Sequence, residues 1–295
     1  MNMMNQQINP RDKILACSGG GAHTTSYIGF WKYVYDEQNF KPDCIVGTSG
    51  GALFGCFMAA GISSKEMEAA FKKYKPWKQF RIAPLLWIAD FLFYWGLVRI
   101  KKIQRLLISI FNEFDIDWDS FTETKFQCVV TDLNDGKRKY VPNDIDMDLP
   151  TAIAASIAIP GIFEPVWFKG KDGSTHCFVD GGVCEGYPIK AALKRGRENV
   201  KIFAISPFDV TQKREYTFEK KMQYARVLYR TLLDAKGEDM IDLLDEDLGD
   251  YYLPTGFKSD HVLDFDWETV KTNINLGYKT AKENHKIIDS FFKNP

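Results

Sequence analysis

Short apolar runs alternate with amphipathic stretches along the first part of the chain. Residues 13–17 and 43–46 form apolar runs that are too short for helices, which indicates buried strands. The run at 13–17 is followed by a stretch with helical spacing at 26–38, and the run at 43–46 by a helix of small residues at 52–60. This strand–helix–strand–helix order predicts a parallel sheet that is covered by helices.

The same alternation returns in the rest of the chain. Ser63 or Ser64 is expected to cap a further helix, because Glu66 follows where its first turn would lie. A turn signal at 134–136 predicts that the strands on either side of it are neighbours. Strands are expected at 126–131, 137–141, 177–179 and 200–205, and helices at 151–157, 217–235 and 267–292.

Residues 77–111 interrupt this pattern. The stretch at 82–98 is almost entirely apolar, but Asp90 interrupts it and it is shorter than the roughly 20 residues of a membrane-spanning helix. A cap, a lid or a segment at a membrane surface is therefore favoured over a transmembrane helix. Its candidate membrane or substrate contacts are Trp87, Phe91 and Trp95.

The second half of this insertion predicts an amphipathic basic helix. Apolar residues at 100, 103, 106, 107, 110 and 111 share one helical face, whereas Lys101 and Lys102 lie elsewhere on its surface. Two interpretations are open. The apolar face packs on the domain, or it enters a membrane surface while the two lysines meet anionic lipid.

Composition and charge narrow the class of protein. With 38 basic and 39 acidic residues the net charge is −1, which does not favour nucleic-acid binding. None of the six cysteines forms a C-x-x-C pair and most lie in apolar runs, so we expect free thiols in a reducing compartment. No secretory signal is recognisable at 1–12. We expect a cytoplasmic protein with one domain at 13–295 after a disordered tail at 1–12, able to attach peripherally to membranes.

Ser49 has the sequence context of a nucleophile. It lies in Gly47-Thr48-Ser49-Gly50-Gly51, between a predicted strand and a predicted helix. A sharp strand-to-helix turn exposes the hydroxyl of its central residue, and the following helix directs free N–H groups at a developing anion. A tight glycine turn with an incidental serine is the alternative.

A second glycine turn follows the first predicted strand. Ser18-Gly19-Gly20-Gly21 leaves backbone N–H groups free to face an oxyanion. A dinucleotide site is the rival interpretation, but Thr24 replaces the last glycine of G-x-G-x-x-G. Two glycine turns at successive strand ends fit a nucleophile with an oxyanion hole better than they fit one cofactor.

The nucleophile needs a base, and the sequence offers two kinds. His261 or His285 would preserve the Ser…Asp…His order of an α/β-hydrolase, although neither has a catalytic context. Asp180 ends a predicted strand and precedes Gly181-Gly182. Aspartate is a poor base at its usual pKa of roughly 3.9, but burial beside the serine would raise that pKa.

Four blocks of the chain, taken in order, resemble the patatin-like phospholipase family. They correspond to its glycine-rich loop, its nucleophile elbow, its proline-containing loop and its catalytic-aspartate motif. The blocks are Gly19-Gly20-Gly21-Ala22-His23 with Gly29, Gly47-Thr48-Ser49-Gly50-Gly51, residues 155–165 with Pro160, and Asp180-Gly181-Gly182 with Pro188.

The resemblance implies a fold and a mechanism. The fold is a three-layer α/β/α sandwich with a mostly parallel central sheet. The chemistry is hydrolysis of acyl esters in phospholipids or related lipids by a Ser49–Asp180 dyad, without catalytic histidine, cofactor or metal. Backbone N–H groups of Gly19, Gly20 and Gly21 would hold the oxyanion, and the partners would be the lipid substrate and a membrane surface.

The glycine-rich loop departs from the family's pattern at two positions. His23 stands where the family usually has arginine or lysine, and Thr24 where it has glycine. The altered Thr24 keeps open a catalytically silent protein that binds lipid or a partner. An acyltransferase or thioesterase with the same dyad also stays open, because an acyl-enzyme can pass its acyl group to acceptors other than water.

Overall fold

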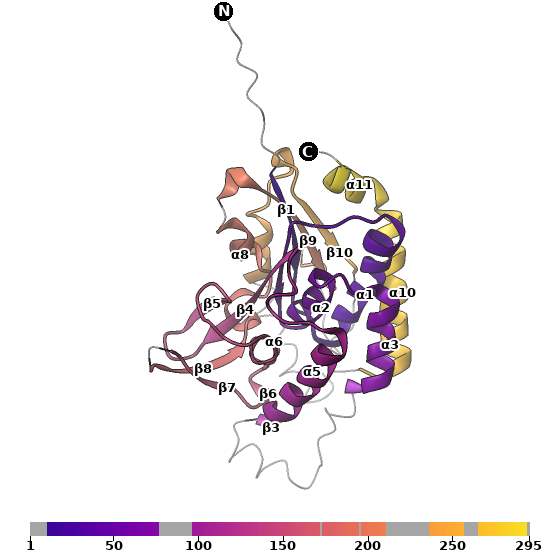
Figure 1. The fold of residues 1–295 in the computed structure, drawn as a ribbon. Coiled ribbons are helices and arrows are strands. Elements are labelled where there is room, and N and C mark those ends of the chain that lie inside the picture. Colours follow the sequence, from indigo (N-terminus) through magenta and orange to yellow (C-terminus); the bar gives the residue numbers. More distant parts are fainter. Residues whose placement is uncertain are drawn as a thin grey trace, which may run out of the picture.

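A central sheet forms the middle layer of the molecule, as seen in the computed structural model (Figure 1). The structure describes residues 11–76, 96–171, 173–194, 196–210, 236–256 and 265–293. Within them the strand order is β10-β9-β1-β2-β4-β8-β7, with β5 also paired to β4. The strands are β1 (Asp12–Cys17), β2 (Cys44–Thr48), β4 (Lys125–Asp132), β5 (Lys137–Val141), β7 (Val166–Lys169), β8 (Thr175–Asp180), β9 (Val200–Ser206) and β10 (Tyr251–Pro254).

The sheet is mostly parallel, as the sequence predicts. The strands β10, β9, β1, β2 and β4 run parallel to their neighbours, whereas β5, β8 and β7 join by antiparallel pairing. The turn at 134–136 makes β4 and β5 adjacent, so this pairing is confirmed. A separate ribbon pairs β3 (Gly96–Val98) with β6 (Gly161–Phe163).

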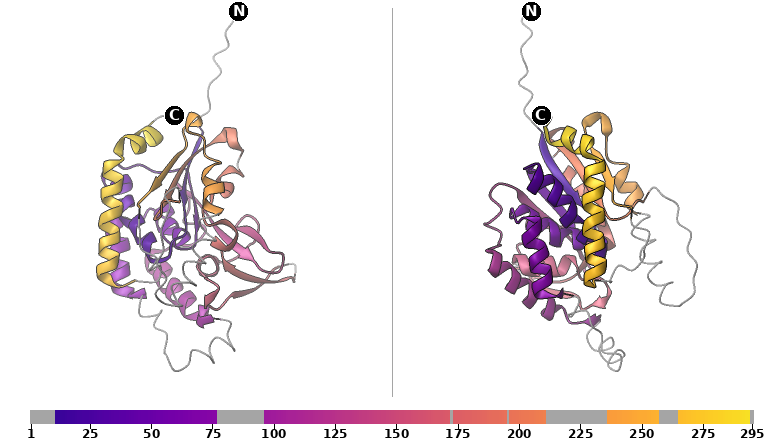
Figure 2. Two further views of the ribbon diagram at one scale, coloured as in Figure 1. Left: turned by 180° about the vertical axis from the view of Figure 1, so that it is seen from behind. Right: turned by 90° about the vertical axis from the view of Figure 1, so that its right-hand side faces the viewer.

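Helices cover both faces of the sheet, so the expected three-layer architecture is confirmed. Along β1, Leu15 and Cys17 belong to one buried cluster, whereas Ile14 and Ala16 belong to another on the opposite face. Successive side chains of a strand point to opposite faces, so both faces of this strand are buried. Figure 2 shows the layers from two further directions.

Several helices lie at predicted positions. They are α1 (Ser26–Trp31), α2 (Gly50–Ala59), α3 (Ser64–Tyr74), α5 (Ile100–Phe114), α6 (Leu149–Ser156), α10 (Trp267–Glu283) and α11 (His285–Lys293). The short helices α7 (Gly182–Glu185) and α8 (Ile189–Leu193) were not predicted. Shorter helical turns are η1 (Gly21–Thr25), η2 (Lys32–Glu37), η4 (Arg197–Asn199) and η5 (Glu246–Leu248).

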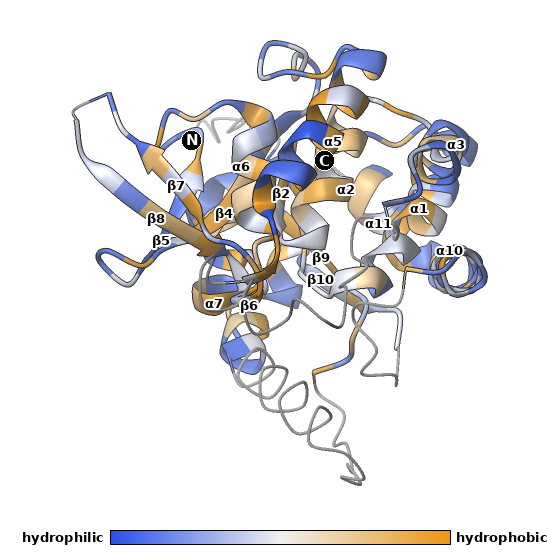
Figure 3. Ribbon diagram, turned by 90° about the horizontal axis from the view of Figure 1, so that it is seen from below, coloured by the Kyte–Doolittle hydropathy of each residue, from blue (hydrophilic) through white to orange (hydrophobic). Residues whose placement is uncertain are grey.

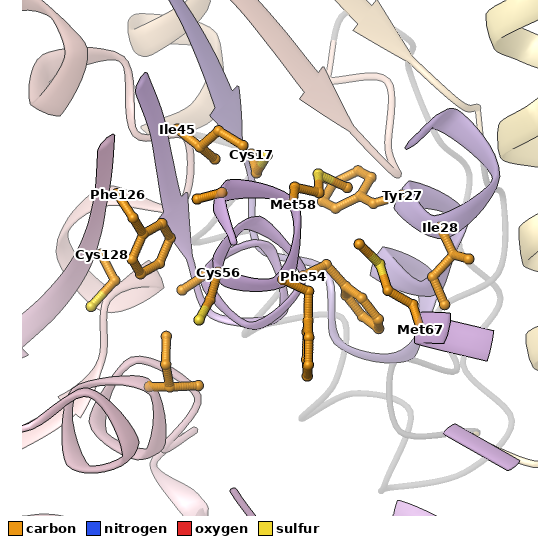
Figure 4. Packing of buried hydrophobic residues seen from close by; sticks show 14 of the residues in the cluster. Cys17, Tyr27, Ile28, Ile45, Phe54, Cys56, Met58, Met67, Phe126 and Cys128 are labelled. Atoms are coloured by element: carbon orange, nitrogen blue, oxygen red, sulfur yellow. The ribbon is translucent and has the colours of Figure 1, made fainter. Parts of the chain in front are cut away.

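The larger buried cluster surrounds α2. Cys17 and Ile45 from the sheet lie on one side of this helix, and Tyr27 and Ile28 from α1 lie on another (Figure 4). The view in Figure 3 shows hydrophobic residues gathered at the central strands and α2, while α3 and α10 are more hydrophilic. Burial of α2 on all sides fixes the position of the residue that precedes it.

The predicted helix cap is confirmed, and two predicted helices are corrected. Ser63 caps α3, and its backbone N–H donates to Glu66 Oε2 at 2.9 Å. The helix expected at 26–38 becomes a π-helix at η2 after α1 ends at Trp31. The helix expected at 267–292 is divided at Asn284, where α10 ends and after which α11 begins at His285.

The boundaries at the chain start and in the insertion differ in part from the prediction. Asp12, assigned to the tail, begins β1 and pairs with Val200. The tail at 1–10 and the helix expected at 217–235 lie outside the described residues. The short strands β3, β6, β7 and β10 were not expected.

The amphipathic helix of the insertion packs on the domain. Ile103 and Leu107 on α5 are 3% exposed and Phe111 is 1% exposed, so the apolar face belongs to the core. Lys101 and Lys102 are exposed. Trp87, Phe91 and Trp95 lie outside the described residues. In the part of the chain that is described, no helix is long and apolar enough to cross a membrane.

Helices α1 and α10 touch through their backbones. A Cβ placed on Gly29 would lie 1.9 Å from Ile274 O, and one placed on Gly277 would lie 1.9 Å from Ser26 O. No side chain fits at these distances, so the two helices approach each other only because both positions are glycine.

This contact predicts that a glycine-to-alanine substitution in a helix, which usually stabilises a protein, destabilises this one. Gly277→Ala should lower the free energy of unfolding by about 1–3 kcal/mol, because the methyl group forces α1 and α10 apart. At an exposed helical position the same substitution would stabilise by up to about 1 kcal/mol. Urea unfolding measures the difference, with Asn275→Ala on the exposed face of α10 as the control. A more stable Gly277→Ala variant would contradict the contact.

Candidate active site

Ser49 forms the sharp turn between β2 and α2. Thr48 is the last residue of β2 and Gly50 the first of α2. The backbone of Ser49 has φ 56° and ψ −128°, a conformation with positive φ that costs a residue with a side chain about 1–3 kcal/mol. The turn also brings the following backbone close to β1, because a Cβ on Gly51 would lie 2.3 Å from Cys17 O. The sharp strand-to-helix turn that the sequence predicts at Ser49 is therefore present.

The hydroxyl of Ser49 is bonded to the carboxylate of Asp180. Ser49 Oγ donates to Asp180 Oδ2 at 2.7 Å, and Gly182 N–H donates to Asp180 Oδ1 at 2.7 Å. Asp180 is the last residue of β8 and pairs with Val130 on β4. The structure thus brings together the two residues that the sequence predicts as the dyad.

Burial makes Asp180 a usable base. Its side chain is almost fully buried, and this desolvation raises its pKa from 3.8 to about 7. The hydrogen bonds from Ser49 and Gly182 oppose the shift, because they favour the charged carboxylate. A carboxylate with this pKa accepts a proton near neutral pH far better than an exposed aspartate.

Ser156 was not predicted to take part, yet it fixes the elbow. Its hydroxyl accepts the Ser49 N–H at 2.9 Å and donates to Val129 O at 2.7 Å. It lies at the end of α6 and is fully buried. The block at 155–165 contained this residue, but only the folded chain places it beneath the nucleophile.

The glycine-rich loop lies directly beside the nucleophile. A Cβ on Gly19 would lie 3.2 Å from Ser49 Cβ. The Gly19 N–H donates to Gly186 O at 2.9 Å. In this structure it is therefore not free for an oxyanion, which differs from the expectation. The N–H groups of Gly20 and Gly21 make no hydrogen bond among the described residues, and neither does that of Gly50 at the start of α2. These three donors remain for an oxyanion.

Thr24 stands where the family usually has glycine, and the lack of a side chain at Gly50 leaves room for it. Thr24 is fully buried, and its hydroxyl donates to Gly21 O at 2.6 Å. A Cβ on Gly50 would lie 2.2 Å from Thr24 Oγ1, so threonine fits here because position 50 has no side chain. His23 is also buried and contacts the ring of Phe208 edge to face.

Histidine does not contact the nucleophile in the described part of the chain. His285 is exposed at the start of α11, where its Nδ1 lies 3.1 Å from Lys282 O. His176 Nδ1 lies 2.6 Å from Asp132 Oδ2, and Nε2 lies 2.7 Å from Ser174 Oγ. His261 lies outside the described residues. Among the candidate bases that the structure describes, Asp180 is the one in contact with Ser49.

Metal ligands do not gather anywhere in the described ranges. No three His, Cys, Asp or Glu side chains there are placed to hold an ion together. The polar groups around Ser49 are instead a carboxylate, a hydroxyl and backbone amides. Such a set suits acyl transfer through a serine nucleophile.

Known proteins resemble this chain in sequence and in fold. The chain is 26% identical over 233 residues to the uncharacterized protein YqhO of Bacillus subtilis, covering 74% of this chain and 79% of that protein. The match to the crystal structure of VipD from Legionella pneumophila covers 96% of this chain and 67% of the VipD chain, with 14% sequence identity and a TM-score of 0.48. The type III effector protein ExoU matches 95% of this chain and 54% of its own, with 12% identity and a TM-score of 0.36.

The family comparison covers most of the chain, including both members of the dyad. The sequence pattern described as Patatin-like phospholipase matches residues 15–193, which extend from β1 to α8. This range contains the glycine-rich loop, Ser49 and Asp180. With its α/β fold and this match, the chain belongs to the patatin-like phospholipase family.

Proposed function

We propose that this protein hydrolyses fatty-acyl esters of phospholipids or lysophospholipids through a Ser49–Asp180 dyad. The observation that carries the proposal is the 2.7 Å hydrogen bond from Ser49 Oγ to a buried carboxylate whose pKa is raised to about 7. Membership of a family of lipid acyl hydrolases supports the class of substrate.

In the first half of the reaction, Ser49 Oγ attacks the acyl carbonyl and its proton passes to Asp180 Oδ2. The carbonyl oxygen becomes an oxyanion, which the N–H groups of Gly20, Gly21 and Gly50 stabilise together with the positive end of the α2 dipole. The tetrahedral intermediate then breaks its bond to the leaving alcohol. Asp180 returns the proton to that alcohol and leaves an acyl-enzyme.

In the second half, Asp180 takes a proton from water, which attacks the acyl-enzyme. The tetrahedral intermediate forms again, and the bond to Ser49 Oγ breaks as this oxygen recovers its proton from Asp180. The fatty acid is released. The first and the last proton transfers run along the contact that Ser49 Oγ and Asp180 Oδ2 already make. The other two pass between Asp180 and the leaving alcohol or the attacking water, so this mechanism needs no histidine.

Substitution of either dyad residue tests the proposal. Ser49→Ala and Asp180→Asn should each lower kcat for fatty-acid release by roughly 10³-fold or more, because one removes the nucleophile and the other its base. Fatty acid released from mixed phospholipid vesicles is measured by mass spectrometry. His285→Ala, at an exposed helix end, is the matched control and should retain wild-type activity. Full activity of Asp180→Asn would contradict the dyad.

The pH dependence follows from the raised pKa of Asp180. The base must be deprotonated, so kcat/KM should be low at acidic pH, fall about tenfold per unit below the midpoint, and level off above about 7. Initial rates on a soluble short-chain ester between pH 5 and 9 measure this limb. A midpoint near 4 would show that Asp180 is not desolvated in the working enzyme.

We also propose that the enzyme binds membrane surfaces peripherally. The apolar face of α5 is in the core, so it does not enter the membrane. We propose that α5 binds the membrane through Lys101 and Lys102, which are exposed at its first turn. Figure 1 shows α5 and the β3–β6 ribbon at the end of the molecule opposite the start of β1. Each basic residue near an anionic membrane surface contributes about 1 kcal/mol to the free energy of binding.

Charge reversal on α5 tests this surface. The double variant Lys101→Glu with Lys102→Glu should bind vesicles containing phosphatidylserine at least tenfold more weakly at low salt, because two attractive charges become repulsive. Vesicle co-sedimentation measures the affinity. Lys271→Glu with Lys279→Glu, the same charge change on the exposed face of α10, should bind as wild type does. Equal binding of both variants would exclude α5 as the contact.

A further inference from the structure

The residues Glu185 and Gly186 contact both loops of the active site with their backbone carbonyls. Gly186 O accepts the Gly19 N–H at 2.9 Å, and Glu185 O accepts the Thr48 hydroxyl at 2.9 Å. Gly19 belongs to the glycine-rich loop, and Thr48 directly precedes the nucleophile. Two successive carbonyl groups therefore hold the oxyanion loop and the nucleophile strand in one arrangement.

Little regular structure holds these two carbonyl groups in place. Glu185 is the last residue of α7, which is one turn long, and Gly186 follows it before α8 begins at Ile189. Gly186 has no side chain that could anchor the segment. The position of this segment therefore depends on the contacts of the Glu185 side chain.

The Glu185 side chain is fully buried, and its carboxylate contacts groups on two other elements. Tyr140 Oη donates to Oε2 at 2.8 Å, Arg138 Nε lies 3.0 Å from Oε2, and Ala191 N–H donates to Oε1 at 3.1 Å. These partners come from β5 and α8. They hold the end of α7 between the two elements.

A buried carboxylate requires such partners. Burial raises the pKa of Glu185, whereas its contacts with Tyr140 and Arg138 lower it. Loss of one partner leaves a buried charge without compensation, which is strongly unfavourable, so the side chain has a single well-defined position. Arg138 reaches the carboxylate from a side chain that is 35% exposed.

We propose that Glu185 is a positioning residue of the active site, which acts by holding the carbonyl groups that orient the glycine-rich loop and the nucleophile strand. The inference rests on the proposed hydrolytic function. Gly19 lies against Ser49, so a shift of its neighbours moves the Gly20 and Gly21 N–H groups relative to the oxyanion. Displacement of a catalytic group by about 1 Å can cost on the order of 10²-fold in rate.

Glu185 acts through other residues and not on the substrate. Its carboxylate oxygens are bonded to β5 and α8, whereas Asp180 Oδ2 is the carboxylate oxygen on Ser49. A change at Glu185 should therefore alter the positions of the groups around the oxyanion and leave the base Asp180 and its pKa unchanged. The two effects are separable in kinetics.

The substitution Glu185→Gln keeps the shape of the side chain and alters one hydrogen bond. The new amide must point its NH₂ group at either the Ala191 N–H or the Arg138 Nε–H, and both of these are donors. The expected result is a 10- to 100-fold lower kcat on a soluble ester, with KM within about threefold of wild type. The acidic limb of the pH profile should keep its midpoint near 7, because Asp180 is unchanged.

A second substitution should restore activity. In Glu185→Gln with Arg138→Met, the donor that opposes the amide is gone, and Tyr140 can rotate its hydroxyl to accept. We expect kcat to recover at least fivefold over Glu185→Gln. Glu123→Gln is the control, because it removes the charge of an exposed glutamate that is paired with Lys41, and it should behave as wild type.

Labelling of Ser49 by a fluorophosphonate separates this inference from the proposed function. The serine oxygen bonds to phosphorus, fluoride leaves, Asp180 takes the proton, and the phosphoryl oxygen occupies the oxyanion hole. If wild type releases no fatty acid from any lipid, the proposed hydrolysis fails, but the labelling rates of wild type and Glu185→Gln still test the positioning role.

Two outcomes would overturn the positioning role. One is a folded Glu185→Gln variant with the kcat and labelling rate of wild type. The other is a loss that Arg138→Met does not reverse although the double variant unfolds at the wild-type temperature. A slower Glu185→Gln with unchanged KM, unchanged pH midpoint and rescue by Arg138→Met supports it.

Discussion

Burial of the Asp180 carboxylate against the Ser49 hydroxyl sets the requirements that the surrounding structure must meet. A buried charge is costly unless it is hydrogen bonded, and Asp180 receives bonds only from Ser49 Oγ and the Gly182 N–H among the described residues. The same desolvation raises its pKa into the range where it can serve as a base. The same two contacts thus stabilise the buried carboxylate and belong to the proposed catalytic dyad.

The topology of the sheet makes this contact possible. Ser49 follows β2, one of the parallel strands, so it lies where active sites of such sheets usually form, at the carboxyl ends of the strands. Asp180 reaches the same place from the opposite direction, because β8 runs antiparallel to β4 and ends beside Val130. An antiparallel addition to a parallel sheet therefore brings Asp180 to Ser49.

Around the dyad, backbone groups are held by side chains from distant elements. Ser156 accepts the N–H of the nucleophile, and Asn273 on α10 donates to Ala22 O at the start of the chain's first helical turn. Thr24 and Gly50 fit together as a pair, since the threonine occupies space that only a glycine leaves free. The unusual Thr24 is therefore part of a packed loop and not a defect in it.

The sequence by itself determined the central features, because they depend on local patterns. Alternating apolar runs identified the strands that precede Gly19, Ser49 and Asp180, and glycines marked the turns after them. Ordered motifs favoured Asp180 over a histidine as the partner of Ser49, and Asp180 is the residue that the fold places on its hydroxyl. Edge strands such as β7 and β10 escaped prediction, since four residues carry too little pattern.

Only the tertiary structure decided which backbone donors are free and how basic Asp180 is. The Gly19 N–H is taken by Gly186 O, and the Ser49 N–H by Ser156 Oγ, through contacts between residues far apart in the chain. Glu185 and Ser156 carried no recognisable signal, because their roles depend on what the fold packs against them. A hydrogen bond and a desolvated charge are properties of an environment, and that environment exists only after the sheet and its helices have assembled.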